Sequence, residues 1–181
     1  MNYANIKYFD IANGEGVRTS LFVSGCRRHC KGCFNAVTWD FLFGKPFDKK
    51  IEDQIIESCK DPNISGLTLL GGDPFEPENQ RGLINLIRRF KTECSGKNLW
   101  AYSGYLFHVD MIPGGMVYTE VTDEMLKAID VLVDGRFELD LKDISLRFRG
   151  SSNQRIIDVK KSLVANRTIV IDRLMEREKI D

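Results

Sequence analysis

Short apolar runs alternate along this chain with stretches whose apolar residues recur at helical spacing. Four short stretches rich in apolar residues predict buried β-strands, at residues 18–24, 66–70, 98–103 and 129–133. Between the first three runs, residues 48–60 and 78–94 predict helices that cover a sheet, and Asp48 is placed to cap the first helix. Cys59 and Cys94 fall on the apolar stripes of these helices, which predicts that both are core residues. Strands that alternate with helices predict an α/β fold with a mainly parallel sheet.

The remaining stretches give weaker patterns. Residues 108–119 are rich in Pro and Gly and predict an irregular loop, and Thr122 is placed to cap a short helix after it. Residues 156–164 have an ambiguous period, and residues 168–171 form a possible last strand. The charged residues 172–181 predict a solvated helix.

The length and composition of the chain limit its number of domains and its possible partners. Its 181 residues are 43% hydrophobic, so residues 1–181 are predicted to form a single domain. Lys+Arg and Asp+Glu number 26 each, so no global charge favours a nucleic-acid partner. We find no leader sequence and no run of about 20 apolar residues that would span a membrane, which predicts a cytoplasmic protein. A closed eight-stranded barrel needs about 250 residues, so the expected fold is a partial, open parallel β/α barrel of about five to six strands.

Three cysteines follow the first predicted strand with the spacing C-x3-C-x2-C, at Cys26, Cys30 and Cys33. One loop carries all three thiolates, close enough to bind one metal centre. A [4Fe-4S] cluster normally takes four cysteines, so a three-cysteine loop leaves one iron open to a small molecule. A zinc site completed by His29 is an alternative, although neighbouring ligands fit a tetrahedron poorly. Disulfides are less favoured, because three cysteines do not pair evenly and nothing marks the chain as secreted.

A glycine-rich turn follows the second predicted strand, at Gly71-Gly72-Asp73-Pro74. Two residues without a Cβ atom allow the backbone to approach a ligand or to adopt a positive φ. The same turn is also an ordinary way to end a strand. Its position favours a role in binding, because the cysteine loop and this turn both follow strands of a parallel sheet and are expected at one edge of it.

Together, the cysteine loop with Phe34 after it and the Gly-Gly-Asp-Pro turn resemble the radical S-adenosylmethionine (SAM) superfamily. Four stretches further resemble the branch that activates the anaerobic (class III) ribonucleoside-triphosphate reductase: residues 22–26, 70–74, 131–137 and 149–154. The likeness covers the chain to about residue 158, so residues 159–181 are predicted to be a C-terminal extension. The insert around residues 111–118 also departs from the family pattern.

The resemblance implies that Cys26, Cys30 and Cys33 hold a [4Fe-4S] cluster whose open iron binds SAM. It places Gly71, Gly72 and Asp73 at the methionine end of SAM, and Gly32, Cys33 and Phe34 near the adenine. For Phe34, core packing is the alternative. The implied reaction is reductive cleavage of SAM to methionine and a 5′-deoxyadenosyl radical. That radical would take a hydrogen from a glycine near the C-terminus of the reductase, with a low-potential donor such as flavodoxin supplying the electron.

Two other functions remain open at this point. The chain could activate a different glycyl-radical enzyme, or it could be a non-enzymatic zinc-bound interaction module. Asp134 and residues 149–154 match the family stretches, but a strand-ending turn and a solvated loop are their default interpretations, so neither is assigned to the site.

Overall fold

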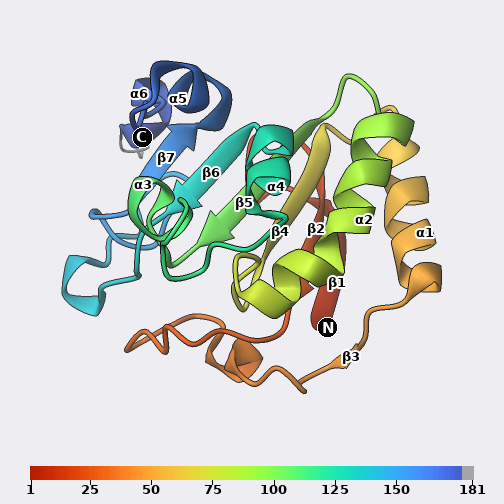
Figure 1. Ribbon diagram of the computed structural model, residues 1–181, viewed down its shortest axis with the longest axis horizontal. Coiled ribbons are helices and arrows are strands. Elements are labelled where there is room, and N and C mark those ends of the chain that lie inside the picture. Colours follow the sequence, from red (N-terminus) through yellow and green to blue (C-terminus); the bar gives the residue numbers. More distant parts are fainter. Residues whose placement is uncertain (177–181) are drawn as a thin grey trace.

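The fold is built on one open sheet of seven strands in residues 1–176, which are the residues that the computed structural model describes (Figure 1). The strands lie in the order β3-β1-β2-β4-β5-β6-β7. The four central strands are parallel, and the outer strands β1, β3 and β7 are antiparallel to their neighbours. Their bounds are β1 Asn2–Asp10, β2 Arg18–Val23, β3 Lys45–Pro46, β4 Gly66–Gly71, β5 Asn98–Ser103, β6 Val131–Asp134 and β7 Arg155–Asp158.

The α/β class and the parallel centre of the sheet confirm the sequence prediction. The prediction of five to six strands was wrong, because the antiparallel strands at the two edges were not recognised. Residues 168–171 do not form a strand; they contribute a single bridge, between Val170 and Ile157. The ambiguous stretch 156–164 contains the end of β7 and, directly after it, a helix.

Six helices occur in the described residues: α1 Lys49–Lys60, α2 Pro77–Glu93, α3 Phe107–Asp110, α4 Thr122–Ala128, α5 Val159–Ala165 and α6 Asp172–Met175. The Asp48 side chain accepts a hydrogen bond from the Ile51 amide, which confirms the predicted cap of α1. Thr122 is the first residue of α4 rather than its cap. The expected loop at 108–119 is irregular except that α3 occupies its start. None of these helices is long and apolar enough to cross a membrane.

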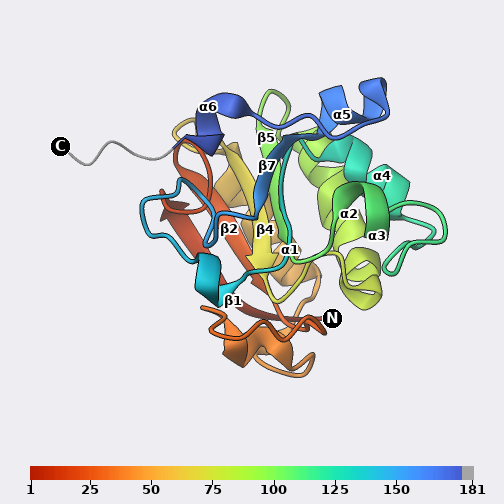
Figure 2. The same ribbon diagram turned by 90° about the vertical axis from the view of Figure 1, so that its left-hand side faces the viewer.

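Two apolar clusters cover the two faces of the sheet. The larger one packs α1, α2 and α4 on one face, and it contains Cys59 and Cys94, as predicted. The smaller one lies on the other face, where Leu174 of α6 packs with Trp100, Val133 and Ile156 (Figure 2). The described part of the predicted solvated helix contains α6, in which Asp172 and Arg173 are exposed, whereas Leu174 is fully buried and packs α6 on the sheet. Residues 177–181 lie outside the described residues.

Candidate functional site

The loops after the central parallel strands meet at one edge of the sheet. β2 leads into the cysteine loop, defined here as residues 24–33, and β4 leads into the Gly71–Pro74 turn. Val23 pairs with Gly71 at this edge, and Ser103 pairs with Asp134, so β5 and β6 end there as well. Parallel α/β proteins bind ligands at this edge. The fold therefore brings together the two motifs that the sequence singled out.

Backbone hydrogen bonds hold the cysteine loop in place. The amides of Gly25 and Cys26 donate to the carbonyls of Thr38 and Trp39, at 2.8 and 3.0 Å, in a 3-10 turn at Ala36–Trp39. The Cys33 amide donates to the Cys30 carbonyl at 3.0 Å. Cys26 and Cys30 are buried, whereas Cys33 is partly exposed. The loop thus presents its thiols from a fixed backbone.

The surroundings of the thiols fit an iron–sulfur cluster. The pKa of Cys26 is raised to about 12, first by burial and then by the nearby Asp73 carboxylate, although the amides of Arg28 and His29 oppose this rise by donating to the sulfur. The Asn35 amide donates to the Cys33 sulfur at 3.4 Å. Amide donors of this kind stabilise cluster thiolates and tune their potential. In residues 1–176, no group of three or more His, Cys, Asp or Glu side chains is arranged to hold a metal ion.

The Gly-Gly turn interlocks with the cysteine loop. The Gly72 amide donates to the Val23 carbonyl at 2.7 Å, and the Asp73 amide donates to the Gly25 carbonyl at 2.8 Å. A Cβ atom on Gly72 would lie 2.5 Å from the Gly25 carbonyl oxygen. Gly71 has a φ of 107°, which side chains rarely adopt. The two glycines are therefore needed for packing against the loop that carries Cys26, whatever ligand the turn binds.

Asp73 is buried behind this turn. Its carboxylate accepts hydrogen bonds from Ser103 Oγ at 2.9 Å and from the amides of Gly104 and Phe75 at 2.8 and 2.9 Å. Burial raises its pKa to about 7, although these three donors favour the charged form. The carboxylate joins the ends of β4 and β5, so its clearest contacts are within the protein.

The raised pKa of Asp73 predicts that the cluster-free protein loses stability as the pH rises from about 4 to about 7. In this range the unfolded chain has released the proton while the folded chain still holds it, so the folded state binds more protons. We expect the free energy of unfolding in urea to fall across pH 5–7 in the wild type. Asp73→Asn should flatten this slope, and an unchanged slope would contradict the assignment.

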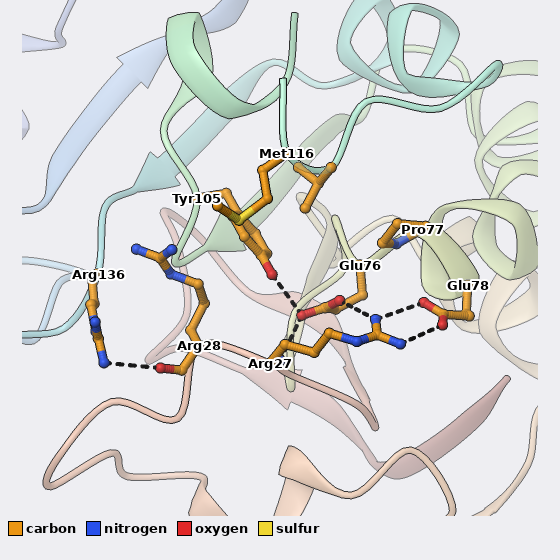
Figure 3. Close-up of a pocket in the computed structure, with 9 residues that line it drawn as sticks. Arg27, Arg28, Glu76, Pro77, Glu78, Tyr105, Met116 and Arg136 are labelled. Carbon is orange, nitrogen blue, oxygen red and sulfur yellow. Dashed lines mark hydrogen bonds and ion pairs between the residues drawn. The ribbon is translucent and has the colours of Figure 1, made fainter. Parts of the chain in front are cut away.

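A pocket of about 430 Å³ opens beside the cysteine loop (Figure 3). Arg28 and Arg136 line it, and the Arg28 guanidinium lies 5.0 Å from the centre of the Tyr105 ring. Arg136 donates to the Arg28 carbonyl at 3.0 Å. On the side of α2 the lining includes Arg27 and Glu76. No sequence motif marks these residues as a group, because only the fold brings the loops that carry them together.

Comparison with known proteins assigns the chain to a family. Residues 12–157 match the family described as a 4Fe-4S single cluster domain. The chain is 46% identical over 158 residues to the anaerobic ribonucleoside-triphosphate reductase-activating protein of Pasteurella multocida, which covers 86% of this chain and 96% of that protein. The chain belongs to this family of activating proteins. The Escherichia coli K12 protein of the same name is 44% identical over 156 residues, with 85% of this chain and 96% of that protein covered. The protein of the same name from Enterobacteria phage T4 is 37% identical over 157 residues, which cover 86% of this chain and 93% of that protein.

Membership in the activating-protein family resolves one alternative left open by the cysteine spacing. The matched family carries a single 4Fe-4S cluster, so the cysteines belong to an iron–sulfur protein rather than to a zinc-bound interaction module. His29, the candidate fourth zinc ligand, instead stacks on Trp39 with ring centres 4.7 Å apart.

Phe34 follows the last cysteine of this activating-protein chain and is 66% exposed, so core packing does not explain it. Its ring lies 5.2 Å from the ring of Phe137, between centres. A Cβ atom on Gly150 would lie 3.0 Å from both rings, and one on Gly32 would lie 2.8 Å from the Leu139 side chain. Residues 131–137 and 149–154 therefore lie close together next to the cysteine loop, and they border the surface on which Phe34 is exposed.

Asp134 and residues 149–154 have structural roles in this family member. Asp134 is fully buried, and its carboxylate accepts hydrogen bonds from Arg155 Nε at 2.8 Å and from the Phe107 amide at 2.8 Å. Gln154 joins its own loop to β6, since its Oε1 accepts from the Gly150 amide at 2.8 Å and its Nε2 donates to the Gly135 carbonyl at 3.0 Å. The strand-ending role expected for Asp134 agrees with these contacts. The solvated loop expected at 149–154 is instead partly buried and internally hydrogen-bonded.

Proposed function

We propose that this chain cleaves SAM reductively at a [4Fe-4S] cluster held by Cys26, Cys30 and Cys33, and that it installs a glycyl radical on an anaerobic ribonucleoside-triphosphate reductase. The observation that carries the proposal is the three-thiol loop locked to the Gly71–Pro74 turn, in a chain from the family of reductase-activating proteins. When bound, the cluster supplies one electron that breaks the C5′–S bond of SAM, giving methionine and a 5′-deoxyadenosyl radical.

The residues of the chain bind and orient the reactants in this proposal. Cys26, Cys30 and Cys33 would hold the cluster with one iron lacking a protein ligand, and SAM would bind at that iron. Gly71, Gly72 and Asp73 lie at the methionine end, and Gly32, Cys33 and Phe34 lie at the adenine end. The exposed ring of Phe34 beside the cysteine loop supports the placement of the adenine. Asp73 acts mainly by fixing the turn, since its carboxylate already accepts three internal hydrogen bonds.

The substrate in this proposal is a protein, and its glycine lies near the C-terminus of the reductase. The deoxyadenosyl radical takes a hydrogen atom from the glycine Cα, which yields 5′-deoxyadenosine and a glycyl radical. A low-potential donor such as flavodoxin supplies the electron, and the reaction takes place in the cytoplasm. The proposal treats residues 1–181 as one radical SAM domain of the partial-barrel type, with residues 159–181 as a C-terminal extension. The open sheet supports the partial-barrel type, and the end of the family match at residue 157 supports the C-terminal extension.

Product analysis tests the chemical half of the proposal. The anaerobically reconstituted protein, incubated with SAM and dithionite, is expected to form methionine and 5′-deoxyadenosine in equal amounts. Chromatography of the quenched mixture measures both products. A protein that holds its full iron content but forms neither product would contradict the proposed reaction.

A further inference from the structure

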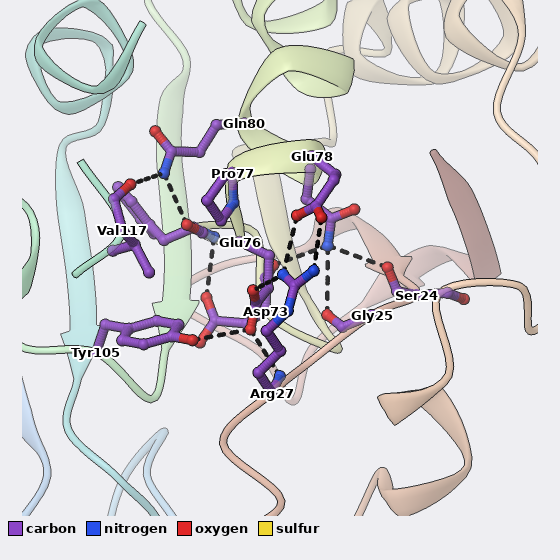
Figure 4. Close-up of polar contacts among 12 residues, drawn as sticks. Ser24, Gly25, Arg27, Asp73, Glu76, Pro77, Glu78, Gln80, Tyr105 and Val117 are labelled. Atoms are coloured by element: carbon purple, nitrogen blue, oxygen red, sulfur yellow. Dashed lines mark hydrogen bonds and ion pairs between the residues drawn. The ribbon is translucent and has the colours of Figure 1, made fainter. Parts of the chain in front are cut away.

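Glu76 is a buried carboxylate that the proposed chemistry leaves without a role. It directly precedes α2, yet its side chain makes no capping hydrogen bond to that helix. The carboxylate turns instead toward the cysteine loop (Figure 4). It accepts from the Arg27 amide at 2.6 Å, from Arg27 Nη1 at 2.6 Å and from the Tyr105 hydroxyl at 2.9 Å. Three donors on one fully buried carboxylate make a rigid contact.

Arg27 connects this carboxylate to the candidate cluster ligands, because it is the residue after Cys26. Glu76 holds both the main chain and the side chain of Arg27, which restricts the backbone next to the cysteine and the direction of the side chain. The other edge of the same guanidinium binds Glu78, at 3.0 and 2.6 Å, and its face lies 4.4 Å from the centre of the Phe41 ring. One arginine thus has a buried carboxylate partner and a half-exposed one.

Removal of Glu76 and removal of Glu78 should have different effects on the cysteine loop. Glu78 is half exposed, so water and salt screen its charge. The Glu76 side chain is only 1% exposed, and its removal would leave the half-exposed Arg27 cation with Glu78 as its carboxylate partner, so the net charge beside the cysteine loop would become more positive. It would also free the Arg27 amide, which no other contact in the described residues holds. The loss of Glu76 should therefore change both the backbone of the loop and the electrostatic potential at its thiolates.

We infer that Glu76 is a positioning residue for the cluster: through Arg27 it fixes the backbone beside Cys26, and its charge balances the Arg27 cation so that the cluster keeps a low reduction potential. The inference rests on the proposed cluster ligands. Reduction adds negative charge to a cluster, so an uncompensated nearby cation favours the reduced form and raises the potential. Tyr105 contributes the third donor, and burial together with Glu76 raises the pKa of its hydroxyl, which therefore stays protonated.

The test compares Glu76→Gln with Glu78→Gln, because both variants remove one negative charge from the same arginine. The readouts are iron per chain after anaerobic reconstitution and the midpoint potential from a redox titration followed by electron paramagnetic resonance. Glu76→Gln keeps an oxygen that can accept from the Arg27 amide, so it is expected to retain its iron and to shift the potential to more positive values. Glu76→Ala removes that acceptor as well and is expected to lose at least half of its iron. Glu78→Gln is expected to match the wild type in both readouts. An unchanged Glu76→Gln, or an equal shift in Glu78→Gln, would overturn the inference.

Arg27→Met gives an independent arm should Glu76→Gln fold poorly. It leaves the Glu76 charge without its guanidinium partner, so the potential is expected to shift in the opposite direction, to more negative values. The double variant Glu76→Gln/Arg27→Met removes both charges, and its potential should return toward that of the wild type. Potential shifts of the same sign in the two single variants would overturn the electrostatic role. Neither readout needs SAM, so a wild-type protein that fails to cleave SAM would contradict the proposed function without affecting this test.

Discussion

Alanine in place of Cys26, Cys30 or Cys33 is expected to lower SAM cleavage by more than about 100-fold, since the loss of an outer-shell partner alone costs metal sites about 10- to 100-fold. Each thiolate is the sole protein ligand of one iron in the proposed site. The other two cysteines of the chain cannot replace them, because Cys59 and Cys94 pack in the core on the helix-covered face of the sheet. The readouts are iron per chain and the 5′-deoxyadenosine formed with dithionite.

The matched controls for this experiment are Cys59→Ala and Cys94→Ala. Both thiols lie in the apolar core under α1 and α2, away from the cysteine loop, so neither is placed to replace a ligand of that loop. Each control should keep nearly all of its iron and activity, with a loss of about 1 kcal/mol in unfolding free energy from the small cavity that it creates. Full activity in any variant of the cysteine loop would refute the ligand assignment.

Gly72→Ala is expected to lower iron content and SAM cleavage together. The new Cβ atom would lie 2.5 Å from the Gly25 carbonyl oxygen and 2.9 Å from the Gly25 nitrogen, and both are backbone atoms immediately before Cys26. One of the two loops must therefore move, and Cys26 moves with it. The sequence alone predicts a different result, a selective weakening of SAM binding with normal iron, because it assigns the glycine only to the approach of a ligand.

Gly82→Ala is the control for this substitution. Its Cβ atom would meet only the side chain of Met1, whose end can move aside, and alanine favours the helix α2 in which Gly82 lies. The control should keep the iron content of the wild type. Normal iron in Gly72→Ala, with SAM binding weakened as measured by equilibrium dialysis, would show that the packing contact is tolerated and that the ligand explanation is sufficient.

The sequence predicted the centre of the fold better than its edges, for a physical reason. Strands β2, β4 and β5 are buried on both faces, so their apolar residues follow one another instead of alternating with exposed polar residues. Strand β1 alternates between partly buried and exposed positions and is interrupted by irregular pairing, so its pattern is weak. Strand β7 has only four residues, and helix α5 follows without a loop because Asp158 ends the strand and caps the helix.

The sequence predicted the position of the candidate site but not the contacts that support it. The cysteine loop and the glycine turn could be placed at one edge because both follow parallel strands. The contact between Arg27 and Glu76 joins residues that are 49 positions apart, and the hydrogen bond from Tyr105 comes from a third loop. Such contacts depend on side-chain packing at the sheet edge, and no local pattern of apolar and polar residues encodes that packing.

The most direct test of the proposed function is the destination of the radical. The reduced protein, mixed anaerobically with SAM and the anaerobic ribonucleoside-triphosphate reductase from the same source, is expected to produce a glycyl doublet in the electron paramagnetic resonance spectrum. The doublet should be absent without the reductase, without SAM, or with Cys30→Ala in place of the wild type. If 5′-deoxyadenosine forms while the reductase stays radical-free, and another glycyl-radical enzyme from that source gains the doublet instead, the assignment of the reductase as substrate is contradicted.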